Sequence, residues 1–303
     1  MFKNETATTP YLWMLFASFS FASMSVLVHG LGKMVGSPFI VLIRTVVVLA
    51  VLLTIARSSG IQLVFWKPRA LWLRSIAGTI GTLTSFYAMT QLPISNAITI
   101  IHMFPLWVAL LSWPLFGIIP NFGVWVSIAS GFSGIVLLNP PEQTQQYLAM
   151  LAALVGSFSA ALAMTGLHLL RDIDSRAIVI HFAMMLIPVT MLTQLVATWE
   201  SGFTVPTDPI TWWMLLGVGG FATCGQVSMT KAFASGPPAR IAVVALSQVA
   251  ITMIYDVIFW DRSFQGITLL GITLIIGPTA WIMIRDALLT RDPARNIDGS
   301  PKN

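Results

Sequence analysis

Charged residues are scarce in this sequence. Only 9% of its 303 residues are Asp, Glu, Lys or Arg, whereas 56% are hydrophobic; soluble domains carry roughly 25% charged residues. The mean hydropathy of +0.83 gives the same indication. This composition excludes an ordinary soluble globular domain and indicates a chain that folds largely in lipid.

Cysteine is almost absent, because Cys224 is the single one. One thiol supports neither a disulfide framework nor a thiolate metal site, and the four histidines are too dispersed to suggest another metal site. We therefore predict no metal and no cofactor. Cys224 lies in an apolar run, and we interpret it as a small buried hydrophobic residue. The sequence also lacks a G-x-x-x-x-G-K-[ST] motif, which excludes direct ATP hydrolysis.

The chain instead contains apolar runs, each near the length that a helix needs to cross a hydrocarbon core of about 30 Å. Ten such runs cover residues 11–31, 38–56, 70–90, 94–115, 121–138, 147–169, 177–198, 211–231, 240–260 and 264–284. The first run lacks an A-x-A cleavage site, so we interpret it as a retained helix. The connectors leave no room for a separate soluble catalytic domain, and any function must lie among the helices.

The basic residues predict the orientation. If the N-terminus is cytoplasmic, only Lys33 and Arg262 fall outside, and Arg44 lies within the second run. The remaining thirteen of the 16 Lys and Arg residues fall inside: Lys3, Arg57, Lys67, Arg69, Arg74, Arg171, Arg176, Lys231, Arg240, Arg285, Arg291, Arg295 and Lys302. The positive-inside tendency therefore places both termini in the cytoplasm and the protein in the inner (plasma) membrane. Membrane topology accounts for the net charge of +5, so binding to nucleic acid is not needed to explain it.

The two halves resemble each other. Residues 78–97 align with residues 222–241. In this alignment Gly81 corresponds to Gly225, Ala88 to Ala232 and Pro93 to Pro237; a similar shift sets Gly134 on Gly277. A nearly constant offset indicates internal duplication. Five helices per repeat is an odd number, so the second repeat must enter the membrane from the opposite side.

The predicted fold class is therefore an all-α integral membrane protein of ten transmembrane helices, arranged as two inverted five-helix repeats. Inverted repeats usually indicate alternating access about a site at the repeat interface. The predicted segments are a cytoplasmic N-terminus at 1–10, the first repeat at 11–140, an external linker at 141–146, the second repeat at 147–286 and a polar cytoplasmic tail at 287–303.

Several motifs then resemble the drug/metabolite transporter superfamily, and specifically its EamA-type branch. The first half contributes Arg44 in PFIVLIRTVVV, the R-x-x-x-G run from Arg74 to Gly78, the phrase FYAMTQLPISNA and Pro105 in HMFPLWV. The second half contributes GQVSMTKAFASGPPARIAV and GITLLGITLIIG. EamA-like repeats often carry Asn-Glu or Gly-Glu after the fourth helix, whereas this chain has FGIIPNFG there and Trp260-Asp261-Arg262 after the ninth. The resemblance covers nearly the whole chain and implies a secondary transporter.

Ionisable residues inside predicted spans require a reason, because each costs about 2.5 to 3.5 kcal/mol on insertion scales. Arg44 lies about two turns into the second run. It is either an anchor for a carboxylate or phosphate of the substrate or a packing residue that binds backbone carbonyls or a neighbour. Asp256 is the only carboxylate well inside a span and lies at a similar depth. A pair between the two remains open.

Milder polar residues fall on helix faces. Gln248 and Tyr255 share one face of the ninth run with Asp256 beside them, and Gln226 lies on a similar face of the eighth. The repeat offset sets Thr82 opposite Gln226. Small polar residues also serve close helix packing, so the larger Gln226, Gln248, Tyr255 and Asp256 are the better candidates for a cavity. We expect that cavity between the halves, lined by the first, third, fourth, sixth, eighth and ninth helices.

His102 precedes Pro105 by three residues. It either lines a pathway where the proline frees backbone carbonyls or is a neutral histidine bonded to a neighbour. A proton-coupled carrier needs a titratable group in the membrane, and the candidates are Asp256 and then His102. If Arg44 pairs with Asp256, the protein is instead a facilitator or exchanger.

The leading hypothesis is a transporter of a small organic metabolite, such as an amino acid, a nucleoside-like compound or an amphipathic drug-like compound. An enzyme of lipid metabolism is the main alternative, although it needs several clustered carboxylates or histidines. A membrane scaffold or receptor is the third. The expected partners are membrane lipid and a small-molecule substrate, with no nucleic acid. The direction of transport stays open, as does the oligomeric state, with a homodimer as one alternative.

Overall fold

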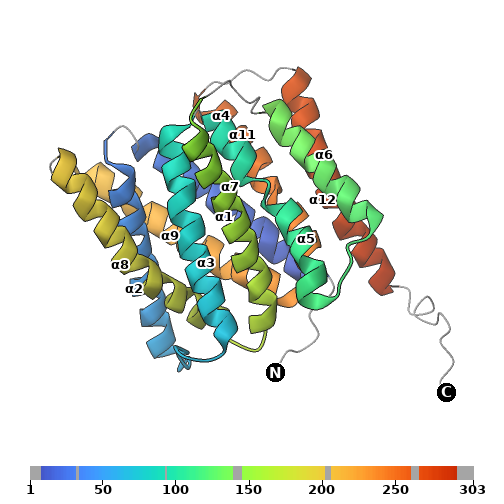
Figure 1. The fold of residues 1–303 in the computed structure, drawn as a ribbon, viewed down its shortest axis with the longest axis horizontal. Helices are drawn as coiled ribbons and strands as arrows, with labels where there is room; N and C mark the ends of the chain where they lie inside the picture. The colour runs from blue at the N-terminus through green and yellow to red at the C-terminus, as the bar shows by residue number, and fades with distance from the viewer. Residues whose placement is uncertain are drawn as a thin grey trace.

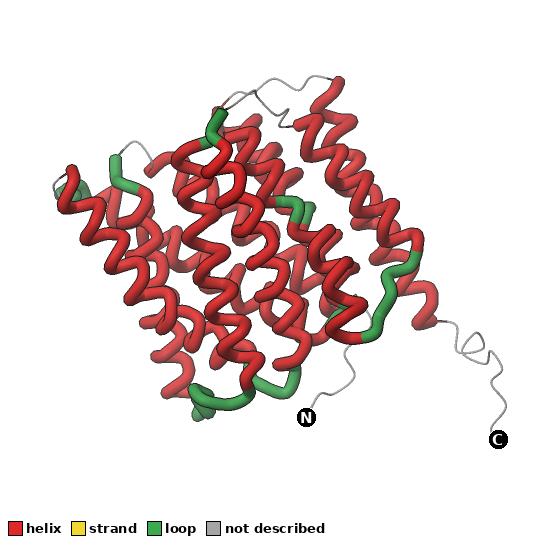
Figure 2. The backbone as a smooth tube through the Cα atoms, in the orientation of Figure 1, coloured by secondary structure: helices red, strands yellow, loops and turns green. Residues whose placement is uncertain are grey.

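The computed structural model describes residues 8–31, 34–92, 94–138, 145–201, 206–260 and 266–291. Within these ranges every regular element is a helix, and no strand occurs (Figure 2). The helices are α1 Thr9–Leu31, α2 Ser37–Ser58, α3 Arg69–Gln91, α4 Ile94–Ile101, α5 Phe104–Phe116, α6 Phe122–Leu138, α7 Tyr147–Leu167, the short 3-10 helix η1 His168–Leu170, α8 Ser175–Ser201, α9 Pro209–Ser235, α10 Pro238–Ala245, α11 Ser247–Trp260 and α12 Gly266–Arg291.

Six helical segments are long and apolar enough, by length and composition, to cross a membrane. They are Thr9–Leu31, Pro38–Ser58, Ala97–Phe116, Tyr147–Leu170, Ser175–Val196 and Pro238–Tyr255. Two shorter apolar helices cover Phe122–Leu137 and Leu269–Arg285. Helices α3 and α9 are also long, but they are less apolar. Because α9 packs against α1, α2 and α8, its polar side chains turn largely toward neighbouring helices rather than lipid.

Two of the predicted runs are interrupted helices. Run 94–115 divides into α4 and α5 around His102 and Met103, and run 240–260 divides into α10 and α11 at Leu246. Pro105 accounts for the first break, because it has no N–H for the carbonyl four residues earlier and its ring collides with that carbonyl. The second break contains no proline. There the Ser18 hydroxyl of α1 lies 3.5 Å from the Ala245 carbonyl.

The helices of the first half of the chain pack mainly against helices of the second half. Helix α1 packs against α9, and α7 packs against α3. Likewise α2 contacts α9 while α8 contacts α3, and α1 contacts α11 while α7 contacts α5. Helices α2 and α8 pair with each other, as do α6 and α12, which lie side by side at one edge of the bundle (Figure 1). Each contact therefore has a counterpart in which the halves trade places.

The glycines aligned by the repeat differ in their surroundings. A Cβ on Gly81 would lie 3.1 Å from the Ala160 nitrogen of α7, and one on Gly225 would lie 2.8 Å from the Phe21 ring of α1. Both glycines thus allow the close crossings just described. Gly134 meets the Gly271 carbonyl of α12, whereas Gly277 faces open space within 4 Å.

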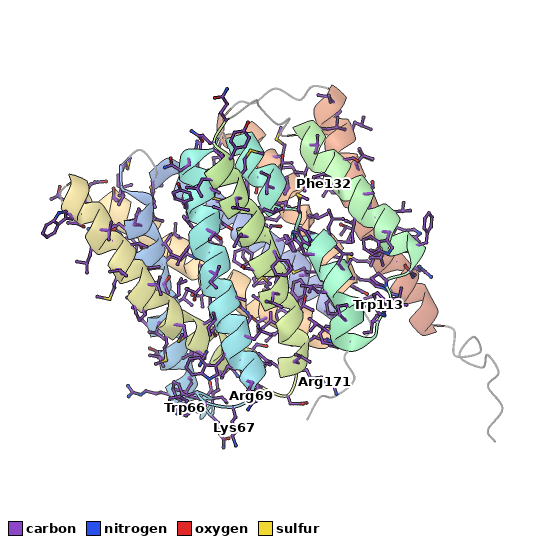
Figure 3. The ribbon with its side chains drawn as sticks, viewed as in Figure 1. Trp66, Lys67, Arg69, Trp113, Phe132 and Arg171 are labelled. Carbon is purple, nitrogen blue, oxygen red and sulfur yellow. The ribbon has the colours of Figure 1, made fainter. Side chains whose placement is uncertain are left out.

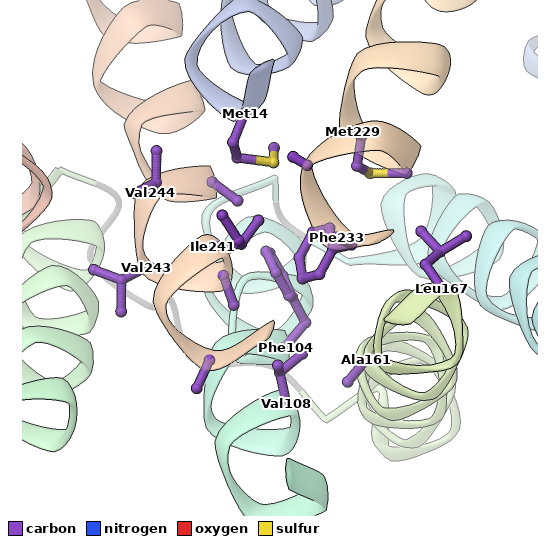
Figure 4. Packing of buried hydrophobic residues seen from close by; sticks show 14 of the residues in the cluster. Met14, Phe104, Val108, Ala161, Leu167, Met229, Phe233, Ile241, Val243 and Val244 are labelled. Carbon is purple, nitrogen blue, oxygen red and sulfur yellow. The ribbon is translucent and has the colours of Figure 1, made fainter. Parts of the chain in front are cut away.

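The largest apolar cluster joins both halves at one end of the bundle. Met14, Phe104, Phe233 and Ile241 are buried there and face one another from α1, α5, α9 and α10 (Figure 4). Leu71 at the start of α3 belongs to the same cluster. This packing fills the interior at the end where the loop between α2 and α3 lies.

One sequence prediction is wrong. Cys224 is exposed on α9, not a small buried residue. Leu216 and Gly220 precede it at intervals of four residues and are exposed as well. Residues at this spacing share one face of a helix, and the described part of the chain leaves this face of α9 exposed.

Candidate functional site

Arg44 places an unsatisfied guanidinium nitrogen inside the bundle. Its Nε is buried and has no hydrogen-bond partner among the described residues. The only ion pair in the described part of the chain joins Arg176 to Asp174, so Arg44 has no carboxylate partner there. Asp256 lies on α11, but its side chain is outside the described residues, and the question of a pair with Arg44 stays open.

Helix α9 carries two buried polar side chains without partners. Gln226 is 9% exposed and Thr230 is 0% exposed, and neither Gln226 Oε1 nor Thr230 Oγ1 has a hydrogen-bond partner in the described chain. They are four residues apart and share a helix face. Ser247, at the break between α10 and α11, is 4% exposed, and its hydroxyl is also unpartnered there. Buried polar atoms of this kind normally find a partner, so these positions suit a bound polar group or water.

Tyr255 connects α11 to α1. Its hydroxyl and the Ser23 hydroxyl are 2.9 Å apart, and the rings of Phe19 and Phe259 lie 6.3 Å and 5.9 Å from the tyrosine ring. Sequence analysis identified Tyr255 but missed Ser23. Helical spacing alone does not reveal Ser23, because the register between two helices is set by their packing.

Thr82 lines a cavity between α2, α3 and α8. The cavity has a volume of about 210 Å³ and a largely apolar lining. The hydroxyl-bearing residues in its lining are Thr82 and Tyr87 of α3 and Thr190 and Thr193 of α8. The Thr82 hydroxyl donates to the Gly78 carbonyl at 2.8 Å. Sequence analysis did not single out the residues of α8, because nothing in the sequence marks that helix as a neighbour of α3.

His102 lies at the break between α4 and α5. Its Nδ1 is 2.9 Å from the Ile98 carbonyl, so Nδ1 carries the hydrogen and Nε2 is left to bind another group. Gln248 is half-buried and is the second residue of α11, two residues after Leu246 at the second break. The two breaks thus each carry one predicted polar residue.

The structure distributes the predicted residues over several places. Thr82 lines the cavity between α2, α3 and α8, Tyr255 bonds to α1, and Gln226 is buried on α9. In the described ranges no group of three His, Cys, Asp or Glu side chains is arranged to hold a metal ion.

Comparison with known proteins gives a consistent result. The sequence model of the EamA-like transporter family matches residues 8–139 and 147–284. The chain is similar to the Pseudopaline exporter CntI of Pseudomonas aeruginosa, with 25% identity over 261 residues for strain UCBPP-PA14 and 24% for strain PAO1; each match covers 86% of this chain and 90% of the relative. An uncharacterized transporter of Helicobacter pylori J99 is 23% identical over 215 residues, covering 69% of this chain and 71% of the relative.

The fold also matches a solved structure. A crystal structure superposes with a TM-score of 0.80 and 16% sequence identity, covering 97% of this chain and 100% of that chain. At this identity the match concerns the fold alone. The agreement spans both halves of the bundle, since almost the whole chain is covered.

Proposed function

The chain belongs to the EamA-like transporter family, and on that premise we propose that it is a secondary transporter that moves a small organic metabolite by alternating access. Multi-pass membrane insertion follows from the family and the apolar helices. We further propose that ten helices span the membrane as two inverted repeats of residues 11–140 and 147–286, joined by an external linker at 141–146. The inner membrane is the proposed location, with cytoplasmic termini at 1–10 and 287–303.

The exchange of helix contacts supports the inverted repeat. Suppose that α1 to α6 and α7 to α12 are equivalent units related by a two-fold axis. The axis then converts the contact of α1 with α9 into the contact of α7 with α3. It also relates α2 to α8 and α6 to α12, and each of these pairs is in contact across the axis. Both units also break their helix at the corresponding place. Interrupted helices at a repeat interface typically form the substrate sites of secondary transporters.

The observation that carries the proposal is the set of buried polar atoms without partners. Gln226 Oε1, Thr230 Oγ1 and Ser247 Oγ are unpartnered among the described residues. They lie on α9 and at a helix break, where a solute with hydrogen-bonding groups would replace water. Arg44 is the proposed anchor for an anionic group of that solute, and Thr82, His102, Gln248 and Tyr255 complete the proposed site.

The largest apolar cluster and the cavity lie at different levels of the bundle. The apolar cluster of Phe104 and Phe233 fills one end of the bundle, whereas the cavity beside Thr82 lies toward the other end. In alternating access one end closes while the other opens. Export is the proposed direction, because two relatives bear the name of an exporter.

The test uses purified protein in two steps. A thermal-shift screen against amino acids, nucleosides and amphipathic compounds finds ligands, because a ligand that binds only the folded state raises its apparent stability. Uptake of those ligands into proteoliposomes then compares Gln226→Ala and Tyr255→Phe with wild type. We expect at least a tenfold loss of transport in each variant, because each loses about one buried hydrogen bond to a substrate or a helix neighbour.

Matched controls separate the site from general effects. Gln62 is exposed in the loop after α2, and Tyr147 is 75% exposed at the start of α7. Gln62→Ala and Tyr147→Phe are expected to transport normally. Normal transport by both site variants, with folded protein, contradicts the proposed site, whereas turnover of lipid substrates without solute uptake contradicts the proposed function.

A further inference from the structure

The loop between α2 and α3 exposes apolar and basic side chains together. Leu63, Phe65 and Trp66 are 37%, 39% and 80% exposed. Lys67 follows directly and Arg69 begins α3, and both are exposed. The positive-inside tendency accounts for the two cations, but neither transport nor the helix core explains why large apolar residues are exposed beside them.

Aromatic contacts hold this loop against the bundle. The Trp66 ring lies 5.8 Å from the Trp72 ring of α3, and Trp72 meets His181 of α8 edge-on at 5.1 Å. His181 Nδ1 is 2.7 Å from the Ser75 hydroxyl. Because the chain of contacts reaches buried residues, the loop presents its side chains in a defined arrangement.

Further cations gather at the same end. Trp66, Lys67, Arg69 and Arg171 lie together at this end of the bundle (Figure 3), and Arg171 is exposed. The nearby acidic residues offset this charge only in part. Asp174 binds Arg176 at 2.8 Å, so Asp172 is the exposed carboxylate left beside Arg171.

The location determines the chemistry of the partner. At the ends of membrane helices, tryptophan lies at the level of the lipid headgroups and basic residues lie near their phosphates. Anionic headgroups attract clustered Lys and Arg. An acidic protein partner is disfavoured, because Leu63 and Phe65 would then sit in water rather than in the apolar part of the interface whenever the partner is absent.

We propose that the loop from Leu63 to Arg69 is a binding site for an anionic phospholipid headgroup. Lys67 and Arg69 bind the phosphate and the anionic headgroup, and Trp66 with Phe65 and Leu63 enters the interface beside the acyl chains. The site is separate from the transport site and holds for either orientation of the protein, so its test does not depend on the proposed function.

Binding of fluorescent lipid analogues to detergent-purified full-length protein tests the proposal. Wild type is expected to bind the phosphatidylglycerol analogue more tightly than the phosphatidylcholine analogue. Lys67→Gln and Arg69→Gln should each weaken phosphatidylglycerol binding about fivefold, the value expected for one cation near an anionic surface. The double variant should lose the preference, and Trp66→Ala should weaken the binding of both analogues.

Arg285→Gln is the matched control. Arg285 lies on α12, stacked at 5.3 Å on Trp281, and its substitution removes the same charge away from the loop. It should leave the preference for phosphatidylglycerol unchanged, as should Lys67→Arg. Equal binding of both analogues by wild type overturns the proposal. So does a double variant that keeps the preference, or an Arg285→Gln variant that loses it, since net charge rather than this loop would then be responsible.

Discussion

Individual polar residues in the bundle interior are costly to this protein. A buried donor or acceptor without a partner costs about 1 to 3 kcal/mol, and Arg44, Gln226 and Thr230 each carry such an atom among the described residues. Thr223 and Thr252, in contrast, donate to the carbonyl one turn earlier. The unsatisfied groups are therefore not an unavoidable result of placing polar residues in membrane helices. Thr79, Trp107 and Ser157, outside the proposed site, carry unpartnered buried atoms as well, so transport assays must decide which of these atoms meet a solute.

Asp256 is the residue at which the coupling of transport to a proton gradient can be tested. We expect Asp256→Asn to abolish solute accumulation driven by an imposed pH gradient in proteoliposomes and to leave exchange intact, because the amide cannot carry a proton. Asp172→Asn, at an exposed position, is the control. If accumulation persists in Asp256→Asn, the aspartate is not the proton carrier and His102 is the next candidate. If wild type shows no such accumulation, the protein is a facilitator or exchanger.

The ion pair of Asp174 with Arg176 lies outside the membrane spans. We expect it to make the stability of the folded protein depend on pH. Arg176 lowers the pKa of the Asp174 carboxyl, chiefly through side-chain hydrogen bonds of 3.0 Å and 2.8 Å. Asp174 also accepts the Arg176 backbone N–H at 2.8 Å and so caps α8. A lowered pKa stabilises the folded state above the unfolded pKa of about 3.9, and this contribution disappears as the pH falls through the folded value.

Melting temperatures between about pH 3 and pH 7 test this prediction. Asp174→Asn keeps the capping oxygen but removes the charge, so it should lower the melting temperature at neutral pH and approach wild type in acid. Asp172→Asn should change little at either pH. A constant difference between Asp174→Asn and wild type across the range would show that the charge does not contribute.

At the scale of the helices, the two breaks have different origins. Pro105 marks the first break in the sequence, whereas α10 ends at Ala245 without a proline. The sequence therefore suggests an irregularity only near His102. The second break depends on tertiary contacts, including the approach of Ser18 from α1, and no local pattern predicts it.

The pairing of α6 with α12 depends on Gly134. A Cβ there would lie 2.6 Å from the Gly271 carbonyl, and backbone cannot move aside as a flexible side chain does. We expect Gly134→Ala to lower stability by about 1 to 3 kcal/mol, measured as a lower melting temperature. Gly220→Ala, at an exposed position of α9 where a Cβ would meet nothing within 4 Å, should be neutral or slightly stabilising. Equal effects at both positions would contradict the described packing.

For the whole molecule, the largest apolar cluster and the cavity beside Thr82 lie at different levels of the bundle. Apolar side chains from α1, α5, α9 and α10 close one end, and the cavity with its four hydroxyl-bearing residues lies away from it. Buried apolar residues of α1, α2 and α9, namely Leu31, Phe39 and Leu215, pack at the cavity's end as well.

Orientation is tested by reporter fusions to the intact chain. A reporter after Arg291 should be active only in the cytoplasm, and one in the connector at 142–146 should be active only outside, as the positive-inside tendency requires. The opposite pattern would reverse the topology and place the loop at Lys67 and Arg69 on the outer surface.

The amino-acid sequence alone determined that this protein is helical, that it lies in a membrane and which family it belongs to. Composition and the length of apolar runs suffice for the first two, because the transfer of each residue into lipid is nearly independent of its neighbours. Only the tertiary structure decided that Cys224 faces outward, that Ser23 meets Tyr255, and that Thr190 and Thr193 join Thr82 around a cavity. These features depend on contacts between helices far apart in the chain, and the rotation and register of each helix are set by packing rather than by its own residues.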